Sequence, residues 1–219
     1  MTRPATSGNL PSEADGGPTA LLLVRHGQST WNAERRWQGQ ADPPLSDHGR
    51  EQAFQAAANL GTVDVIVSSP QIRALETAAI IGTQLGVGPV QVVEALRERN
   101  AGMWSGLTTI EIEQQWPGWI DSPQRPEGWE VDADLLVRAT GALDSIVEEF
   151  QGATLLVVSH GGVILVVEDH LRVRDGRVPN LHGRLVTSNR GALHAGERLE
   201  LIPAEMRTGG TGADRGGRV

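Results

Sequence analysis

The stretch LLLVRHGQS, residues 21–29, decides the fold of this 219-residue chain. Its apolar run, residues 21–24, is short and is followed by Arg25, His26 and Gly27, which is typical of a buried parallel strand. A second stretch, TLLVVSHGG at residues 154–162, has the same form. Because open α/β sheets bind ligands at the carboxyl ends of their strands, we expect His26 and His160 to face one pocket. Arg25, beside the first histidine, suits that pocket to an anionic substrate.

Strand and helix patterns alternate along the rest of the chain. Further strands are expected over residues 63–67, 90–93 and 153–158, followed by an irregular hairpin or edge strand over 184–202. Helices are expected over residues 46–60, from 69 onward, 108–116, 132–150 and 160–171. The alternation predicts a three-layer α/β/α domain with a mostly parallel central sheet. This domain is expected over residues 20–203, between a disordered lead, 1–19, and a disordered tail, 204–219.

Polar residues mark where three of these helices begin. Ser46 is the expected N-cap of the first helix. Ser69 is the expected N-cap of the second, with Pro70 as its first helical residue. Thr108 and Glu111 have the spacing of a capping box and should open the third.

The composition excludes several kinds of chemistry. All nineteen basic residues are arginine, and the chain has no lysine, cysteine or tyrosine. A Schiff base, a P-loop lysine, a thiolate nucleophile, a disulfide and a cysteine zinc site are therefore excluded. The net charge of −8 disfavours nucleic acid and anionic membranes as partners, and no run approaches the ~20 apolar residues of a membrane span. We expect a cytoplasmic protein and leave formation of a homodimer open.

The sequence carries no motif for a metal ion, a cofactor or a serine nucleophile. No Gly-x-Ser-x-Gly elbow and no metal-ligand spacing appear. The run EDH at residues 168–170 lies on an expected helix, where adjacent side chains point in different directions. Four histidines are expected to be structural or solvated: His48, His170, His182 and His194.

Five stretches together resemble the motifs of the histidine phosphatase superfamily, the phosphoglycerate-mutase-like enzymes. In chain order they are LVRHGQSTWN (23–32), QGQADPPLS (38–46), SSPQIRALETA (68–78), LRERNAGMWSG (96–106) and VSHGGVI (158–164). The resemblance covers roughly residues 20–170 and favours the phosphatase branch. It implies a phosphoric monoester hydrolase of the histidine acid phosphatase type, which acts on a small-molecule phosphate ester without metal or cofactor.

The resemblance also assigns the residues of a phosphate site. It implies that His26 attacks phosphorus to form phosphohistidine and that Glu98 protonates the leaving alkoxide. Arg25, Arg73 and His160 would hold the phosphate, and a planar guanidinium fits phosphate in a way that an ammonium group cannot. The further residues expected to bind substrate are Asn32, Gln38, Gly39 and Gly161.

Three details of this site stay open in the sequence. A neutral imidazole nucleophile needs its other nitrogen held, for which a backbone carbonyl near Gly27 is a candidate. The amides of Gly161 and Gly162 lie where a helix N-terminus would point them at an anion. Glu94 and Glu111 lie close enough in sequence to replace the assigned acid.

The reaction itself has three interpretations. Mutases of the family use a longer basic segment between the acid and the second histidine, whereas Glu98 and His160 lie only 62 positions apart. Within that interval, residues 116–130 carry one arginine and three acids. Hydrolysis is therefore favoured over a cofactor-dependent phosphoglycerate mutase. A catalytically silent phosphate-binding protein is the third interpretation, and the presence of all the core residues disfavours it.

The identity of the substrate has only weak signals. The run RWQGQ at residues 36–40 resembles that of glucosyl-phosphoglycerate phosphatases in the family, which points to a sugar phosphate. The Pro-rich segment 116–129 is expected to be a loop. Four tryptophans lie in this segment or shortly before it: Trp104, Trp116, Trp119 and Trp129. Their rings either stack on substrate or pack the helix at 107–115 onto the sheet. Asn32 is either a donor to substrate or a turn residue.

Overall fold

The computed structural model describes residues 17–189 and 191–207. The expected disordered segments, 1–19 and 204–219, therefore lie mostly outside the described residues. Two described parts of them lie in regular elements, because strand β1 begins at Thr19 and Ala204–Met206 forms the 3₁₀ turn η3. The carbonyl oxygen of Met206 accepts a hydrogen bond from Nε2 of Gln52 at 2.9 Å, which ties the turn to a helix. Thr19 and Ala204–Met206 thus belong to elements of the fold, and the expected domain bounds stay a prediction.

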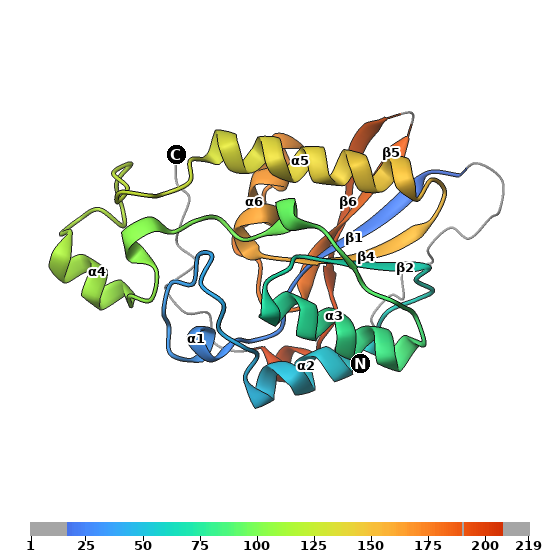
Figure 1. Cartoon of the computed structure of the whole chain (residues 1–219), viewed down its shortest axis with the longest axis horizontal. Coiled ribbons are helices and arrows are strands. Elements are labelled where there is room, and N and C mark those ends of the chain that lie inside the picture. Colours follow the sequence, from blue (N-terminus) through green and yellow to red (C-terminus); the bar gives the residue numbers. More distant parts are fainter. Residues whose placement is uncertain (1–16, 190, 208–219) are drawn as a thin grey trace, which may run out of the picture.

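A six-stranded mixed sheet forms the centre of the molecule, in the order β3-β2-β4-β1-β5-β6 (Figure 1). The strands are β1 (Thr19–Arg25), β2 (Val65–Ser68), β3 (Gln91–Val92), β4 (Thr154–Ser159), β5 (His182–Asn189) and β6 (Ala192–Glu200). β1, β4, β2 and β3 pair in parallel, whereas β5 and β6 form an antiparallel hairpin beside β1. The sheet is therefore mostly parallel and ends in a hairpin, as the sequence predicted.

Helices cover both faces of this sheet and give the predicted three layers (Figure 1). They are α1 (Thr30–Ala33), α2 (Asp47–Ala57), α3 (Ile72–Leu85), α4 (Thr109–Gln115), α5 (Asp132–Glu149) and α6 (Gly161–His170), with 3₁₀ turns η1 (Glu94–Leu96) and η2 (Gly102–Trp104). Side chains of a strand alternate between its faces. Accordingly, Leu22 and Val24 join the core with α2 and α3, while Leu21 and Leu23 join the core with α5 and α6.

Two of the three predicted helix starts are confirmed. Oγ of Ser46 accepts a hydrogen bond from the amide of Gly49 at 3.0 Å and caps α2. Thr108 and Glu111 form the predicted capping box of α4. Within residues 17–189 and 191–207, no helix combines the length and the apolar character that a membrane-spanning segment needs.

The predicted start of α3 is wrong. The helix begins at Ile72, so neither Ser69 nor Pro70 occupies the expected position. The amide of Ile72 donates instead to Oδ1 of Asp42 at 2.6 Å, an acceptor 30 residues away in sequence. Ser69 is therefore released from capping and can serve the site described below.

Five of the six tryptophans lie in a third apolar cluster around α4, apart from the two cores of the sheet. Trp37 and Trp104 are buried in this cluster, while Trp116, Trp119 and Trp129 pack against it. In Figure 1, α4 lies away from the sheet at the carboxyl ends of its parallel strands. Of the two alternatives for the tryptophans, the one in which they pack this helix onto the sheet is therefore wrong. The segment 116–129 is a loop, as predicted.

Candidate active site

A pocket opens at the carboxyl ends of β1 and β4, where the sequence predicted it. Six of the expected site residues line it: Arg25, His26, Asn32, Gln38, Gly39 and Glu98. Arg73 and His160 are buried beside His26. The remaining one, Gly161, is buried at the start of α6, and its neighbour Gly162 lines the pocket instead.

His26 is held as a neutral imidazole with one ring nitrogen bonded to the backbone. Its Nδ1 lies 2.6 Å from the carbonyl oxygen of Gly27, the expected acceptor, so the proton belongs on Nδ1. Its Nε2 accepts a hydrogen bond from Nε of Arg73 at 3.1 Å. Burial, followed by the charges of Arg73 and Arg25, lowers the pKa of His26 well below the usual value. Nε2 therefore carries a lone pair that could attack an electrophile.

Two arginines place positive charge beside this nitrogen. Arg73 is fully buried and also donates through Nη1 to the carbonyl of Ala41 at 2.9 Å and through Nη2 to that of Gly39 at 3.1 Å. Two of its five N–H donors remain for a ligand. Burial lowers the pKa of Arg73 to about 10, so the guanidinium stays charged at neutral pH. Arg25 lines the pocket and donates through Nη1 to the carbonyl of Val178 at 2.8 Å.

His160 is the N-cap of α6 and faces His26, with the two ring centroids 5.2 Å apart. Its Nε2 lies 2.8 Å from Oγ of Ser69. Burial, followed by the charges of Arg73 and His26, lowers the pKa of His160 well below the usual value. Its Nδ1 is buried and has no hydrogen-bond partner in the described part of the chain. The hydrogen-bonding capacity of this nitrogen is therefore unused by the described residues.

Glu98 is the carboxylate that faces the pocket. Its Oε1 accepts from the amide of Arg99 at 2.7 Å, and its Oε2 from the amide of Gly162 at 3.1 Å. The expectation that the Gly162 amide points at a bound anion is therefore wrong. The two alternative acids lie elsewhere, because Glu94 is exposed and Glu111 accepts hydrogen bonds within the capping box of α4.

The other expected contacts to substrate also have structural tasks. Oδ1 of Asn32 accepts from the amide of Ser29 at 3.2 Å and completes the capping box of α1, so Asn32 is a turn residue that also lines the pocket. Oε1 of Gln38 accepts from the hydroxyl of Ser29 at 2.7 Å. Gly39 has a φ of +51°, and a Cβ there would lie 2.8 Å from Ala101, so this close approach requires glycine.

Two polar residues that the sequence did not single out hold the site together. Oε1 of Gln71 accepts from the amide of Glu98 at 2.7 Å, and its Nε2 donates at 3.2 and 3.1 Å to the two carbonyls that also bind Arg73. Nδ2 of Asn180 donates to the carbonyl of His26 at 2.8 Å. Gln71 lies in the same motif as Arg73, which is a usable signal, whereas the segment around Asn180 carries none.

No group of three or more His, Cys, Asp or Glu side chains able to hold a metal ion occurs in the residues that the structure describes. Glu168 is fully buried and pairs with Nε of Arg184 at 2.9 Å and with Nη2 of Arg198 at 2.5 Å. Asp169 pairs with Arg174 at 2.6 Å. Both carboxylates of the run 168–170 are therefore engaged in ion pairs.

Known proteins share this arrangement of sequence and fold. A sequence model of the histidine phosphatase superfamily (branch 1) matches residues 21–189. A glucosyl-3-phosphoglycerate phosphatase of Mycolicibacterium vanbaalenii is 39% identical over 158 residues, which cover 66% of this chain and 70% of that protein. The bifunctional protein Rv2228c of Mycobacterium tuberculosis is 39% identical over 155 residues, which cover 67% of this chain and 42% of that protein. This chain thus matches less than half the length of that relative.

The solved structure of Bacillus stearothermophilus YhfR has the same fold, with a TM-score of 0.76 and 30% identity over 86% of this chain and 99% of that one. The family match includes both histidine motifs and the segments that carry Arg73 and Glu98. The fold brings these four segments to one pocket. The chain belongs to the histidine phosphatase superfamily.

Proposed function

We propose that this protein is a phosphomonoesterase that forms phosphohistidine on Nε2 of His26. The observation that carries the proposal is the position of this nitrogen, 3.1 Å from Nε of Arg73 in the pocket that Arg25 lines. A phosphate monoester dianion needs positive charge and hydrogen-bond donors around its free oxygens. Nδ1 of His160, which has no partner among the described residues, adds a further group for one of these oxygens.

The reaction proceeds in two steps. The Nε2 lone pair attacks phosphorus, so that a P–N bond forms while the ester P–O bond breaks, and protonated Glu98 gives its proton to the leaving oxygen. Water then attacks phosphorus, and the P–N bond breaks with its electron pair returning to Nε2. The carboxylate of Glu98 takes a proton from that water, which releases phosphate and restores the enzyme.

The surroundings of His26 favour the histidine acid phosphatase type. An ordinary histidine is largely protonated below a pH of about 6.5 and cannot then act as a nucleophile. Burial and two arginines keep the pKa of His26 well below that value. The nucleophile accordingly stays uncharged in mildly acidic solution.

We further propose that the substrate is a small sugar phosphate. Trp129 lines the pocket, and the guanidinium of Arg99 lies 5.3 Å from its ring centroid. An aromatic face and a cation therefore lie in the same pocket as the residues proposed to bind phosphate. Such walls, with a few polar groups, are typical of small-molecule sites. A relative named glucosyl-3-phosphoglycerate phosphatase supports an ester that contains a sugar. The net charge of −8 supports action on a free metabolite rather than on nucleic acid or a membrane.

The decisive experiment combines a substrate panel with a trap of the intermediate by rapid alkaline quench. Sugar phosphates, phosphoglycerates, phosphoserine and p-nitrophenyl phosphate are compared for phosphate release, with phosphoglycerate mutase activity measured beside them. A ³²P-labelled substrate is expected to leave acid-labile label on the wild type and none on His26→Ala. His170→Ala, at the far end of α6, is the matched control and should keep both label and activity. Turnover retained by folded His26→Ala, or mutase activity above hydrolysis, would contradict the proposal.

A further inference from the structure

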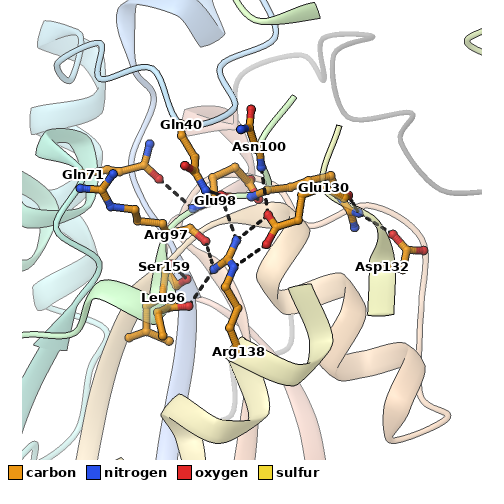
Figure 2. A network of polar contacts seen from close by, with 12 residues as sticks. Gln40, Gln71, Leu96, Arg97, Glu98, Asn100, Glu130, Asp132, Arg138 and Ser159 are labelled. Carbon is orange, nitrogen blue, oxygen red and sulfur yellow. Dashed lines mark hydrogen bonds and ion pairs between the residues drawn. The ribbon is translucent and has the colours of Figure 1, made fainter. Parts of the chain in front are cut away.

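Helix α5 carries a single basic side chain, Arg138, and this guanidinium binds the segment that precedes and includes Glu98 (Figure 2). Nη1 donates to the carbonyls of Ala95 at 2.7 Å and Arg97 at 2.6 Å. Nη2 donates to the carbonyl of Glu98 at 3.0 Å. Three backbone oxygens from four successive residues therefore converge on one side chain.

The remaining donors of Arg138 bind Glu130, which directly follows the loop 116–129. Nε donates to Oε1 at 2.6 Å and Nη2 to Oε2 at 2.8 Å, so the carboxylate is held by two parallel bonds. Oε2 also accepts from the amide of Asn100 at 3.0 Å. A guanidinium has five N–H donors in a rigid fork, and all five of Arg138 are now in use.

The segment bound in this way has little regular structure to hold it. Between the end of β3 at Val92 and Glu98, the chain forms only the 3₁₀ turn Glu94–Leu96, so most carbonyls of this segment lack the partners that a helix or sheet would supply. The peptide groups of Glu98 are fixed from two sides: Oε1 of Gln71 accepts from its amide at 2.7 Å, and Arg138 donates to its carbonyl. The backbone of the acid is thus anchored before its carboxylate meets any substrate.

We propose that Arg138 is a positioning residue that sets the geometry of proton transfer by Glu98. The inference rests on the proposed function, because it takes Glu98 as the general acid. Arg138 does not line the pocket, so it acts through the acid and not on substrate. General acid catalysis requires the carboxyl to lie within hydrogen-bond reach of the leaving oxygen, and displacement of about 1 Å can cost a hundredfold in rate.

The inference predicts a loss that depends on the leaving group. p-Nitrophenolate leaves with little need of a proton, whereas the alkoxide of glycerol phosphate needs one. For Arg138→Gln we expect kcat to fall about tenfold or more on glycerol phosphate and about twofold on p-nitrophenyl phosphate, with KM nearly unchanged. Arg138→Lys should restore part of the difference, because an ammonium group has three donors where the guanidinium has five.

The matched control is Arg198→Gln. Arg198 also forms a two-bond pair with a carboxylate, that of Glu168, and donates to a backbone carbonyl at 2.7 Å. Its side chain is 20% exposed and that of Arg138 is 22% exposed. The midpoint temperature of thermal unfolding should therefore fall by a similar amount in both variants. Arg198→Gln should change kcat on the two substrates by the same factor.

Glu98→Gln separates failure of this inference from failure of the proposed function. The inference is supported if Glu98→Gln loses more kcat on glycerol phosphate than on p-nitrophenyl phosphate and the double variant with Arg138→Gln shows no larger difference between the two substrates. If Glu98→Gln is selective and Arg138→Gln is not, the inference is overturned and the proposed function stands. If Glu98→Gln is itself unselective, the acid assignment fails and the inference falls with it. Should Arg138→Gln not fold, Glu130→Gln weakens the same pair, and an equal loss on both substrates would overturn the inference.

Discussion

Replacement of Arg73 by lysine tests the phosphate site most directly. In the wild type, this side chain donates to Nε2 of His26 and to the carbonyls of Gly39 and Ala41, and two donors remain for phosphate. An ammonium group has three donors at a single point and cannot reach both carbonyls and a phosphate together. Arg73→Lys is therefore expected to impair both stability and catalysis.

The two magnitudes can be estimated separately. Gln71 still donates to both carbonyls, at 3.2 and 3.1 Å, so neither is left without a partner. The stability loss is then about the net value of two hydrogen bonds, roughly 2 kcal/mol. Losing one charge-assisted bond to the transition state costs about 1.5–3 kcal/mol, which is about tenfold to a hundredfold in kcat/KM.

The assay is kcat/KM on p-nitrophenyl phosphate together with urea unfolding of the same preparations. Arg50→Lys is the matched control, because Arg50 is more than one-third exposed and pairs with Glu76 and Asp47 outside the pocket. We expect the control to keep its kcat/KM. An Arg73→Lys protein with lower stability and unchanged kcat/KM would refute the reasoning, since Arg73 would then only support the loop that carries Gly39.

Three further predictions follow from particular contacts. A Cβ at Gly162 would collide with Oε1 of Glu98, so Gly162→Ala should lower turnover of alkyl phosphates several-fold. Gly141→Ala is the control, because a Cβ there meets open space and activity should stay unchanged. Equal activities of the two variants would contradict this prediction. Burial lowers the pKa of His26 and His160 below 6.5, so the unfolded chain binds more protons than the native one as pH falls through 6.5. The free energy of unfolding should therefore decrease with acidification, and each of these two histidines should contribute up to about 1 kcal/mol per pH unit. His26→Asn should remove the contribution of His26 from the slope in urea titrations. Activity should survive EDTA, because the guanidinium groups of Arg25 and Arg73 supply positive charge at the site, and a loss that a divalent ion restores would count against this mechanism.

Local pattern is enough to place the elements that carry the site. The apolar runs that end in His26 and His160 predict parallel strands, because strand length and apolar character are properties of neighbouring residues. Ser46 and the pair Thr108 and Glu111 predict their helix starts for the same reason, since a cap joins residues three positions apart. From strands of this kind, the general geometry of α/β sheets brings both histidines to one edge.

Side-chain direction and long-range hydrogen bonds follow only from the tertiary structure. The motif resemblance assigns Glu98 as the acid but leaves the nearby Glu94 and Glu111 as alternatives. Only the path of the chain turns Glu98 to the amide of Gly162, 64 positions away. The N-terminal amide of α3 is bound by Asp42 from a separate loop, which no local pattern can reveal.

Arg138 and Asn180 illustrate the physical reason. Arg138 meets the acid segment across about 40 positions, and Asn180 meets the carbonyl of His26 across 154. A propensity or a periodicity describes how a residue relates to its neighbours along the chain. A buried polar group is satisfied by whichever partner the packing of sheet and helices brings within about 3 Å, and that partner is decided by the whole fold.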